Sequence, residues 1–136
     1  MKKGDAGLIV LMVAACCYLS HNVAAAGHVP TTAVFSVPPY PAPSCSGVDG
    51  GNMFVELDQT RWSDSYCGKK LRVFCMGAAD PDVTQACNPS SSHSVDVVVV
   101  GLCDDCGEAT MDLSKDAYDA IAYEDAGRVK VGYSWI

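Results

Sequence analysis

The strongest hydrophobic pattern in the chain is a run of four valines within residues 95–100, bounded by Asp96 and Gly101. Beta-branched residues lose little rotamer freedom in a pleated strand, and an uninterrupted apolar run is typical of a strand that is covered on both faces. We therefore predict that this strand lies in the middle of the core.

Weaker patterns predict further strands on either side of it. Apolar and polar residues alternate over residues 53–57, 69–76 and 129–135, and a β-like run covers residues 31–37. Such alternation indicates a strand with one buried face. Prolines cluster in residues 38–43, and because proline removes a ladder donor we expect an extended surface segment there. Several short strands with one helix and no internal repeat favour a small β-barrel.

The one predicted helix follows a cysteine-pinned turn and a short strand. Ser114 is a candidate N-cap, and Asp116 stands in the first turn, where the helix dipole favours an anion. Gly127 supplies a C-terminal stop. Asp112 directly precedes the helix start, and we expect it to lie near the functional site.

The first 26 residues have the layout of a secretory signal peptide. Two lysines precede an apolar run over residues 6–19, and a polar break leads to small residues that end at Ala26. The apolar run is shorter than the roughly 20 residues that a transmembrane helix needs. We predict cleavage after Ala26 and one domain over residues 27–136.

Charge limits the partners of this domain. Residues 27–136 hold seven Lys and Arg against fifteen Asp and Glu. An acidic surface repels phosphate backbones and anionic lipids, so it argues against nucleic acid partners and membrane insertion. We expect a monomer in the extracellular space.

Six cysteines remain after the predicted cleavage, and an even number in a short exported chain implies a disulfide framework. They are Cys45, Cys67, Cys75, Cys87, Cys103 and Cys106. Six cysteines allow 15 pairings, and their spacing does not choose among them.

The spacing of Cys103 and Cys106 also suits redox or zinc chemistry, but their surroundings do not. Two intervening aspartates would raise the thiol pKa, and zinc would need two further ligands. His28 and His93 do not form a ligand-spaced pair. We therefore expect a structural disulfide, and no metal or cofactor.

Four strings carry a family resemblance: CGKKLRVFC, VDVVVVGLCDDC, TMDLSKDAYDAIA and GRVKVGYSWI. Together they resemble the plant natriuretic peptide group of expansin-like proteins, also called family-45 endoglucanase-like domain proteins. The resemblance covers nearly all of residues 27–136, with the six cysteines in the expected order.

This resemblance implies an all-β fold, a six-stranded double-psi β-barrel with one short helix and three disulfides, as in barwin and the first domain of expansins. It implies an apoplastic protein without the second, carbohydrate-binding domain of true expansins. It also implies the pairings Cys45 with Cys67, Cys75 with Cys87, and Cys103 with Cys106.

Departures from the family pattern bear on activity. Asp112 matches the Asp of the family's His-Phe-Asp motif, but Thr110 and Met111 replace the His and Phe. Residues 33–36 read Ala-Val-Phe-Ser where the family often has Ala-Thr-Phe-Tyr, so we expect both polar groove residues to be missing. Gly101 stands at the position of a second Asp.

Inverting glycoside hydrolysis needs an acid and a base roughly 6.5 to 9.5 Å apart. We find no clear partner for Asp112, because Asp104 and Asp105 lie in a turn that would present them to water. We therefore predict that the protein is not an enzyme. The alternative for Asp112 is a buried polar residue bonded to backbone amides near the helix start.

Three residues are candidates for a binding groove: Asp112, Tyr118 and Trp62. An isolated Trp more often covers a core than binds a sugar, and core packing is the favoured role of Tyr133 and Trp135. The resemblance implies an apoplastic signal in water and solute homeostasis, with a cell-surface receptor as partner. The alternatives are a wall polysaccharide-binding or wall-loosening protein, a barwin-like defence protein that binds chitin and, as the weakest, a residual glycoside hydrolase that uses Asp112.

Overall fold

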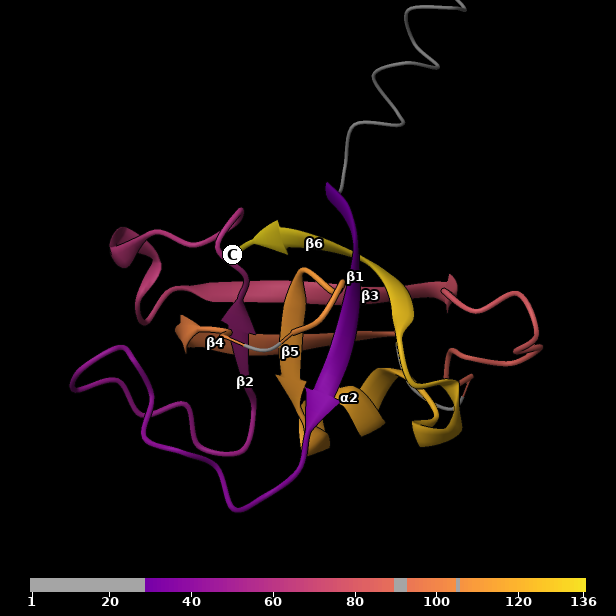
Figure 1. Ribbon diagram of the computed structural model, residues 1–136, viewed down its shortest axis with the longest axis horizontal. Helices are drawn as coiled ribbons and strands as arrows, with labels where there is room; N and C mark the ends of the chain where they lie inside the picture. The colour runs from indigo at the N-terminus through magenta and orange to yellow at the C-terminus, as the bar shows by residue number, and fades with distance from the viewer. Residues whose placement is uncertain (1–28, 90–92, 105) are drawn as a thin grey trace, which may run out of the picture.

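The computed structural model describes residues 29–89, 93–104 and 106–136 (Figure 1). Its strands are β1 (Val29–Ser36), β2 (Phe54–Leu57), β3 (Lys70–Ala78), β4 (Ser94–Leu102), β5 (Met111–Ser114) and β6 (Val129–Trp135). One α-helix, α2 (Lys115–Ile121), and two short 3-10 turns, η1 (Asp64–Tyr66) and η2 (Glu124–Ala126), complete the elements. The predicted signal peptide lies outside the described residues.

The six strands close into a barrel in the order β1-β5-β2-β4-β3-β6. The pairs β1–β5 and β2–β4 are parallel, and the other four pairs are antiparallel. Figure 1 shows β1, β2 and β5 crossing the long strands β3 and β4 at a steep angle. The predicted six-stranded barrel with one helix is confirmed. The two parallel pairs join strands that are distant in sequence, so periodicity gave no sign of them.

The barrel interior is filled by alternate residues of the strands. Those with less than 2% exposure include Val55, Leu71, Val73, Val97, Val99, Met111, Leu113, Val129 and Val131. Helix α2 packs against β1, β4 and β5 and adds Ala117, Tyr118 and Ile121 to the same core. Because inward residues alternate with outward ones along each strand, the neighbours of these residues form the outer wall.

The predicted helix start is confirmed, and its predicted end is wrong. The Ser114 hydroxyl accepts a hydrogen bond from the Ala117 N–H at 3.3 Å, and Asp116 stands in the first turn. The helix ends at Ile121, before Gly127. Gly127 instead follows the 3-10 turn η2 with a φ of 64°, a conformation that glycine adopts without steric cost.

The valine-rich strand β4 is covered on both faces only near its end. Val97 and Val99 point into the core, whereas Val98 is half-buried and Asp96 is exposed. Val99, Val100 and Gly101 are all buried, and Ser44 lies against Gly101 on the outer face. The prediction of full burial on both faces was therefore wrong for the first half of the strand.

Three disulfides join Cys45 with Cys67, Cys75 with Cys87, and Cys103 with Cys106. These pairings confirm the ones that the resemblance implied. The first bridge ties the loop before β2 to the segment that leads into β3, and the second ties β3 to its following loop.

Within the described segments, no helix is long and apolar enough to cross a membrane.

Candidate binding site around Asp112

A row of four outward-facing positions crosses four neighbouring strands. Val34 on β1 pairs with Asp112 on β5, Asp112 pairs with Glu56 on β2, and Glu56 pairs with Gly101 on β4. The residues that flank Glu56 and Asp112 along their strands point into the core. Both carboxyl groups therefore lie on the outer face of the barrel wall.

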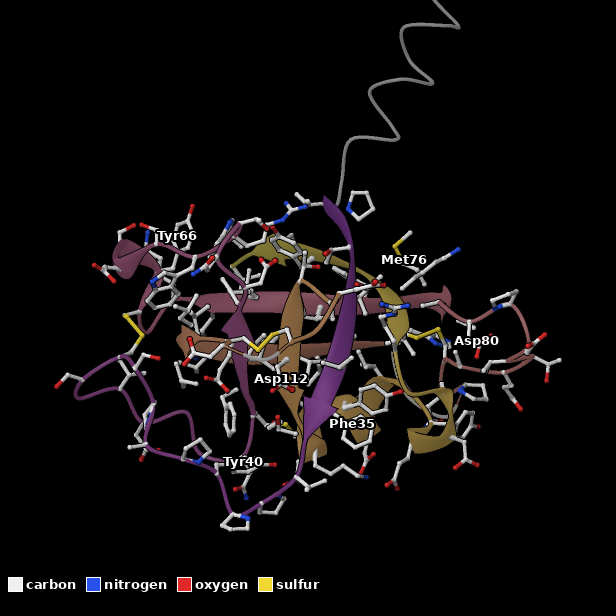
Figure 2. The ribbon with its side chains drawn as sticks, in the orientation of Figure 1. Phe35, Tyr40, Tyr66, Met76, Asp80 and Asp112 are labelled. Atoms are coloured by element: carbon white, nitrogen blue, oxygen red, sulfur yellow. A yellow bond between two sulfur atoms is a disulfide. The ribbon has the colours of Figure 1, made fainter. Side chains whose placement is uncertain are left out.

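Asp112 is buried, with 8% of its surface exposed. Its Oδ2 accepts a hydrogen bond from the Ser36 hydroxyl, and its Oδ1 has no hydrogen-bond partner among the described residues. Burial raises the pKa of Asp112, and the Ser36 hydrogen bond opposes that rise. Among the described residues, no backbone amide donates to Asp112, so the predicted bonds to backbone amides are not seen. The expectation that β1 has lost both polar groove residues is wrong at Ser36, whose hydroxyl bonds Asp112. Figure 2 shows Asp112 on β5 beside β1.

Glu56 is the carboxylate that the sequence analysis missed. It is half-buried, and its pKa is raised first by burial, then by the charge of Asp112 and then by that of Asp104. The expectation that Asp112 has no neighbouring carboxylate is therefore wrong. The sequence does show a Glu between the apolar residues Val55 and Leu57. That this Glu lies beside Asp112 follows only from the pairing of β2 with β5.

Gly101, where the family has a second Asp, has no room for a side chain. A Cβ at this position would lie 2.5 Å from the Ser44 Oγ and 3.0 Å from the Ser44 backbone nitrogen. Ser44 is held there because its Oγ accepts the Leu102 N–H at 3.2 Å. The loop before β2 thus occupies the space that an acidic side chain would need.

The strand positions of the two carboxyl groups limit the chemistry. Adjacent strands lie about 4.8 Å apart, so a carboxylate at position 101 would be two strands, or about 10 Å, from Asp112. Glu56 is only one strand away from Asp112. Directly paired residues on one face of a sheet have Cβ atoms about 4.5 to 5.5 Å apart, so no strand separates the Glu56 and Asp112 side chains.

The aromatic residues that the sequence analysis considered lie elsewhere. Tyr118 is 0% exposed, and its hydroxyl donates to the carbonyls of Tyr123 and Gly127, so it offers no surface to a groove. Trp62 is partly buried and packs on the core, as expected of a residue that covers it. Tyr133 is a core residue, as predicted.

Trp135 departs from the predicted core role. It is 43% exposed and contacts Tyr66, with 4.6 Å between the ring centroids. Among residues 29–89, 93–104 and 106–136, no cluster of three or more His, Cys, Asp or Glu residues suited to a metal ion occurs.

Comparison with known proteins places this barrel in a family. Residues 49–133 match the family described as lytic transglycolase, a double-psi β-barrel family. An EG45-like domain containing protein of Citrus jambhiri is 33% identical over 136 residues, covering 98% of both chains. EG45-like domain containing protein 2 of Arabidopsis thaliana is 34% identical over 75% of this chain and 76% of its own length.

Two solved expansin structures have a fold similar to that of this chain. Apo-expansin of Clavibacter michiganensis is similar with a TM-score of 0.59 and 21% identity over 80% of this chain. A mutant of that expansin in complex with cellohexaose is similar with a TM-score of 0.56 and 20% identity over 79% of this chain. This chain spans 50% of the length of each expansin chain. The chain belongs to the EG45-like domain containing proteins, and its double-psi β-barrel has the fold of the expansins.

Proposed function

We propose that this chain is a secreted, non-hydrolytic protein of the apoplast. The observation that supports this proposal is the burial of Asp112, the residue that would donate a proton to a glycosidic oxygen. A general acid must come within hydrogen-bond reach of the atom that it protonates. Asp112 has one oxygen bonded to Ser36, and Glu56 stands beside it in the same wall.

A second reason concerns how two carboxyl groups share a site. In a glycosidase the acid and its partner flank the scissile bond, so each has to reach the sugar separately. Here the position two strands from Asp112 is Gly101, which the Ser44 loop fills. The neighbouring pair is better suited to holding a ligand than to cleaving one.

As its role we propose an apoplastic signal in water and solute homeostasis, in the manner of the plant natriuretic peptides that the sequence resembles. The match to an EG45-like protein over 98% of both chains supports the family resemblance on which this proposed role rests. Purified protein added to plant protoplasts should change their volume or ion flux, and it should stay in the supernatant when mixed with insoluble wall polysaccharides. An inactive protein in the protoplast assay would contradict the signalling role.

A second candidate is a wall polysaccharide-binding protein, with a neutral glucan in place of a receptor as partner. The similar expansin solved in complex with cellohexaose favours it. Retention on cellulose or xyloglucan, lost on Asp112→Asn, would support this candidate. Retention that Asp112→Asn and Glu56→Gln both leave intact would place binding elsewhere on the barrel.

A further inference from the structure

A cavity of about 290 Å³ lies beside the carboxyl row, between the loop that follows β1 and the outer face of β2 and β4. Its lining includes Tyr40, Pro41, Asp49, Phe54, Glu56 and Val100. Ligand pockets in proteins usually measure about 300 to 1,000 Å³, so this one fits a small molecule. Most of its wall is apolar, and Glu56 joins it to the row described above.

Hydrogen bonds and a ring contact hold the Tyr40 side chain in place in the pocket wall. The Tyr40 hydroxyl accepts the Lys115 N–H at 3.0 Å and donates to the Ser36 carbonyl at 3.4 Å. The Tyr40 and Phe54 rings meet edge to face, with centroids 4.7 Å apart and an angle of 86° between their planes. Figure 2 shows Tyr40 on the loop that leaves β1. The two rings therefore form a fixed aromatic corner.

The charge of the pocket is of one sign. Asp49 and Glu56 contribute carboxylates, and none of the described lining residues is a Lys, Arg or His. The ion pairs of the described residues do not include Glu56. Beside Glu56 on the same face lies Asp112, whose buried Oδ1 has no hydrogen-bond partner among the described residues. The carboxyl groups thus place a negative potential next to the aromatic corner.

We propose that this pocket binds a small organic ammonium ion that carries an apolar body. An ammonium group is attracted to aromatic faces through the ring quadrupole and donates hydrogen bonds to carboxylates. The apolar body would lie against the prolines and Val100. This site goes beyond the proposed function, because its ligand is a small cation rather than a receptor or a wall glucan.

A neutral sugar fits this pocket less well than a cation. A bound sugar would remove water from the Glu56 carboxylate but would bring no positive charge to it. Burying an unpaired carboxylate in a partly apolar site costs free energy. A cation supplies that charge. The sign of the ligand's charge is therefore the property that an experiment should vary.

The test is a titration of the isotope-labelled protein at neutral pH with n-butylammonium, followed by NMR chemical shifts. Neutral n-butanol has a similar shape and serves as the matched ligand. We expect saturable shifts of residues 40–56 with butylammonium at millimolar affinity and at least about tenfold weaker binding of butanol. Glu56→Gln should weaken butylammonium binding by about tenfold, and Tyr40→Leu should weaken it severalfold.

Glu108→Gln is the control variant, because Glu108 pairs with Arg128 on the surface and does not line the pocket. It should bind butylammonium as the unmodified protein does. Circular dichroism confirms that each variant is folded. Equal affinity for butanol and butylammonium, or unchanged butylammonium binding in folded Glu56→Gln, would overturn the proposal.

Discussion

Glu56 and Asp112 are direct antiparallel partners on β2 and β5, and they place two carboxyl groups side by side on the outer wall of the barrel. Directly paired residues on one face of a sheet have Cβ atoms about 4.5 to 5.5 Å apart, and like charges at that separation destabilise the sheet. Binding of a proton to either carboxyl group relieves this repulsion. This relationship gives the protein a characteristic pH dependence.

The free energy of unfolding should fall as the pH rises from the ordinary pKa values of 3.8 for Asp112 and 4.5 for Glu56 through their raised values. A raised pKa means that the folded protein binds protons more tightly than the unfolded chain does. Its stabilising effect is full below the ordinary pKa and is lost above the raised one. Asp112→Asn and Glu56→Gln should each flatten this fall. Asp112→Asn should also stabilise the protein at neutral pH by about 0.5 to 1 kcal/mol.

Urea unfolding at a series of pH values measures both effects. Asp96→Asn is the control with the opposite sign, because the Arg72 hydrogen bond lowers the pKa of Asp96 from its ordinary 3.8. That pair stabilises the fold above the ordinary pKa and less at lower pH, so this variant should not flatten the fall. If the free energy of unfolding still rises between pH 4 and neutrality in the Asp96→Asn variant, the pairing of Glu56 with Asp112 described here is contradicted.

Gly101→Ala should destabilise the fold by about 1 to 3 kcal/mol, the usual cost of overpacking. The new Cβ would lie 2.5 Å from the Ser44 Oγ. Adding Ser44→Gly should recover part of the loss, because it removes that oxygen while the Ser44 backbone nitrogen stays 3.0 Å away. Thermal unfolding of both single variants and the double variant measures the coupling. Additive effects would mean that the two residues do not compete for space.

Removing disulfides should cost stability according to the length of the loop that each one closes. Replacing Cys75 and Cys87 by Ser opens a loop with a sequence separation of 12, and the Cys45–Cys67 pair closes one of 22. We expect losses of about 3 kcal/mol for each, slightly larger for the longer loop, and a smaller loss for Cys103–Cys106 with its separation of 3. Melting temperatures of the three double-serine variants test the order. Full reduction should unfold the domain, since two such losses rival its total stability.

Tyr118→Phe should destabilise the protein by about 1 to 3 kcal/mol, because two carbonyls would lose their shared hydroxyl donor in the core. Tyr123→Phe is a matched control, since Tyr123 is 37% exposed. Burial raises the pKa of Tyr118 to about 12, so ultraviolet titration should show a late tyrosine that is missing in Tyr118→Phe. An unchanged titration curve in this variant would contradict the burial of its hydroxyl.

The sequence predicted those features that depend on local patterns. Strand alternation, the Ser114 cap and the apolar strand near residue 97 are all set by neighbours in the chain, and the structure contains them. The site depends on pairing between distant strands. Glu56 and Asp112 are 56 positions apart, and only the barrel order makes them neighbours.

The sequence contains a pattern that predicts a core position for Tyr118, which we had considered for a binding groove. It shares a helix face with Ala117 and Ile121, and an apolar stripe at that spacing indicates core packing. The cysteine pairs followed from the family resemblance, because spacing leaves all pairings open. Gly101 could not be understood from sequence, since the loop that fills its space comes from residue 44.

Release of reducing ends from cellulose, xyloglucan and mixed-linkage glucan decides whether the carboxyl pair cleaves glycosidic bonds. We expect the purified, disulfide-intact protein to release no more than buffer does, and Asp112→Asn and Glu56→Gln to behave identically. Turnover by the unmodified protein that either substitution abolishes would show that the pair acts as a catalytic acid and its partner, and would contradict the non-hydrolytic function proposed here.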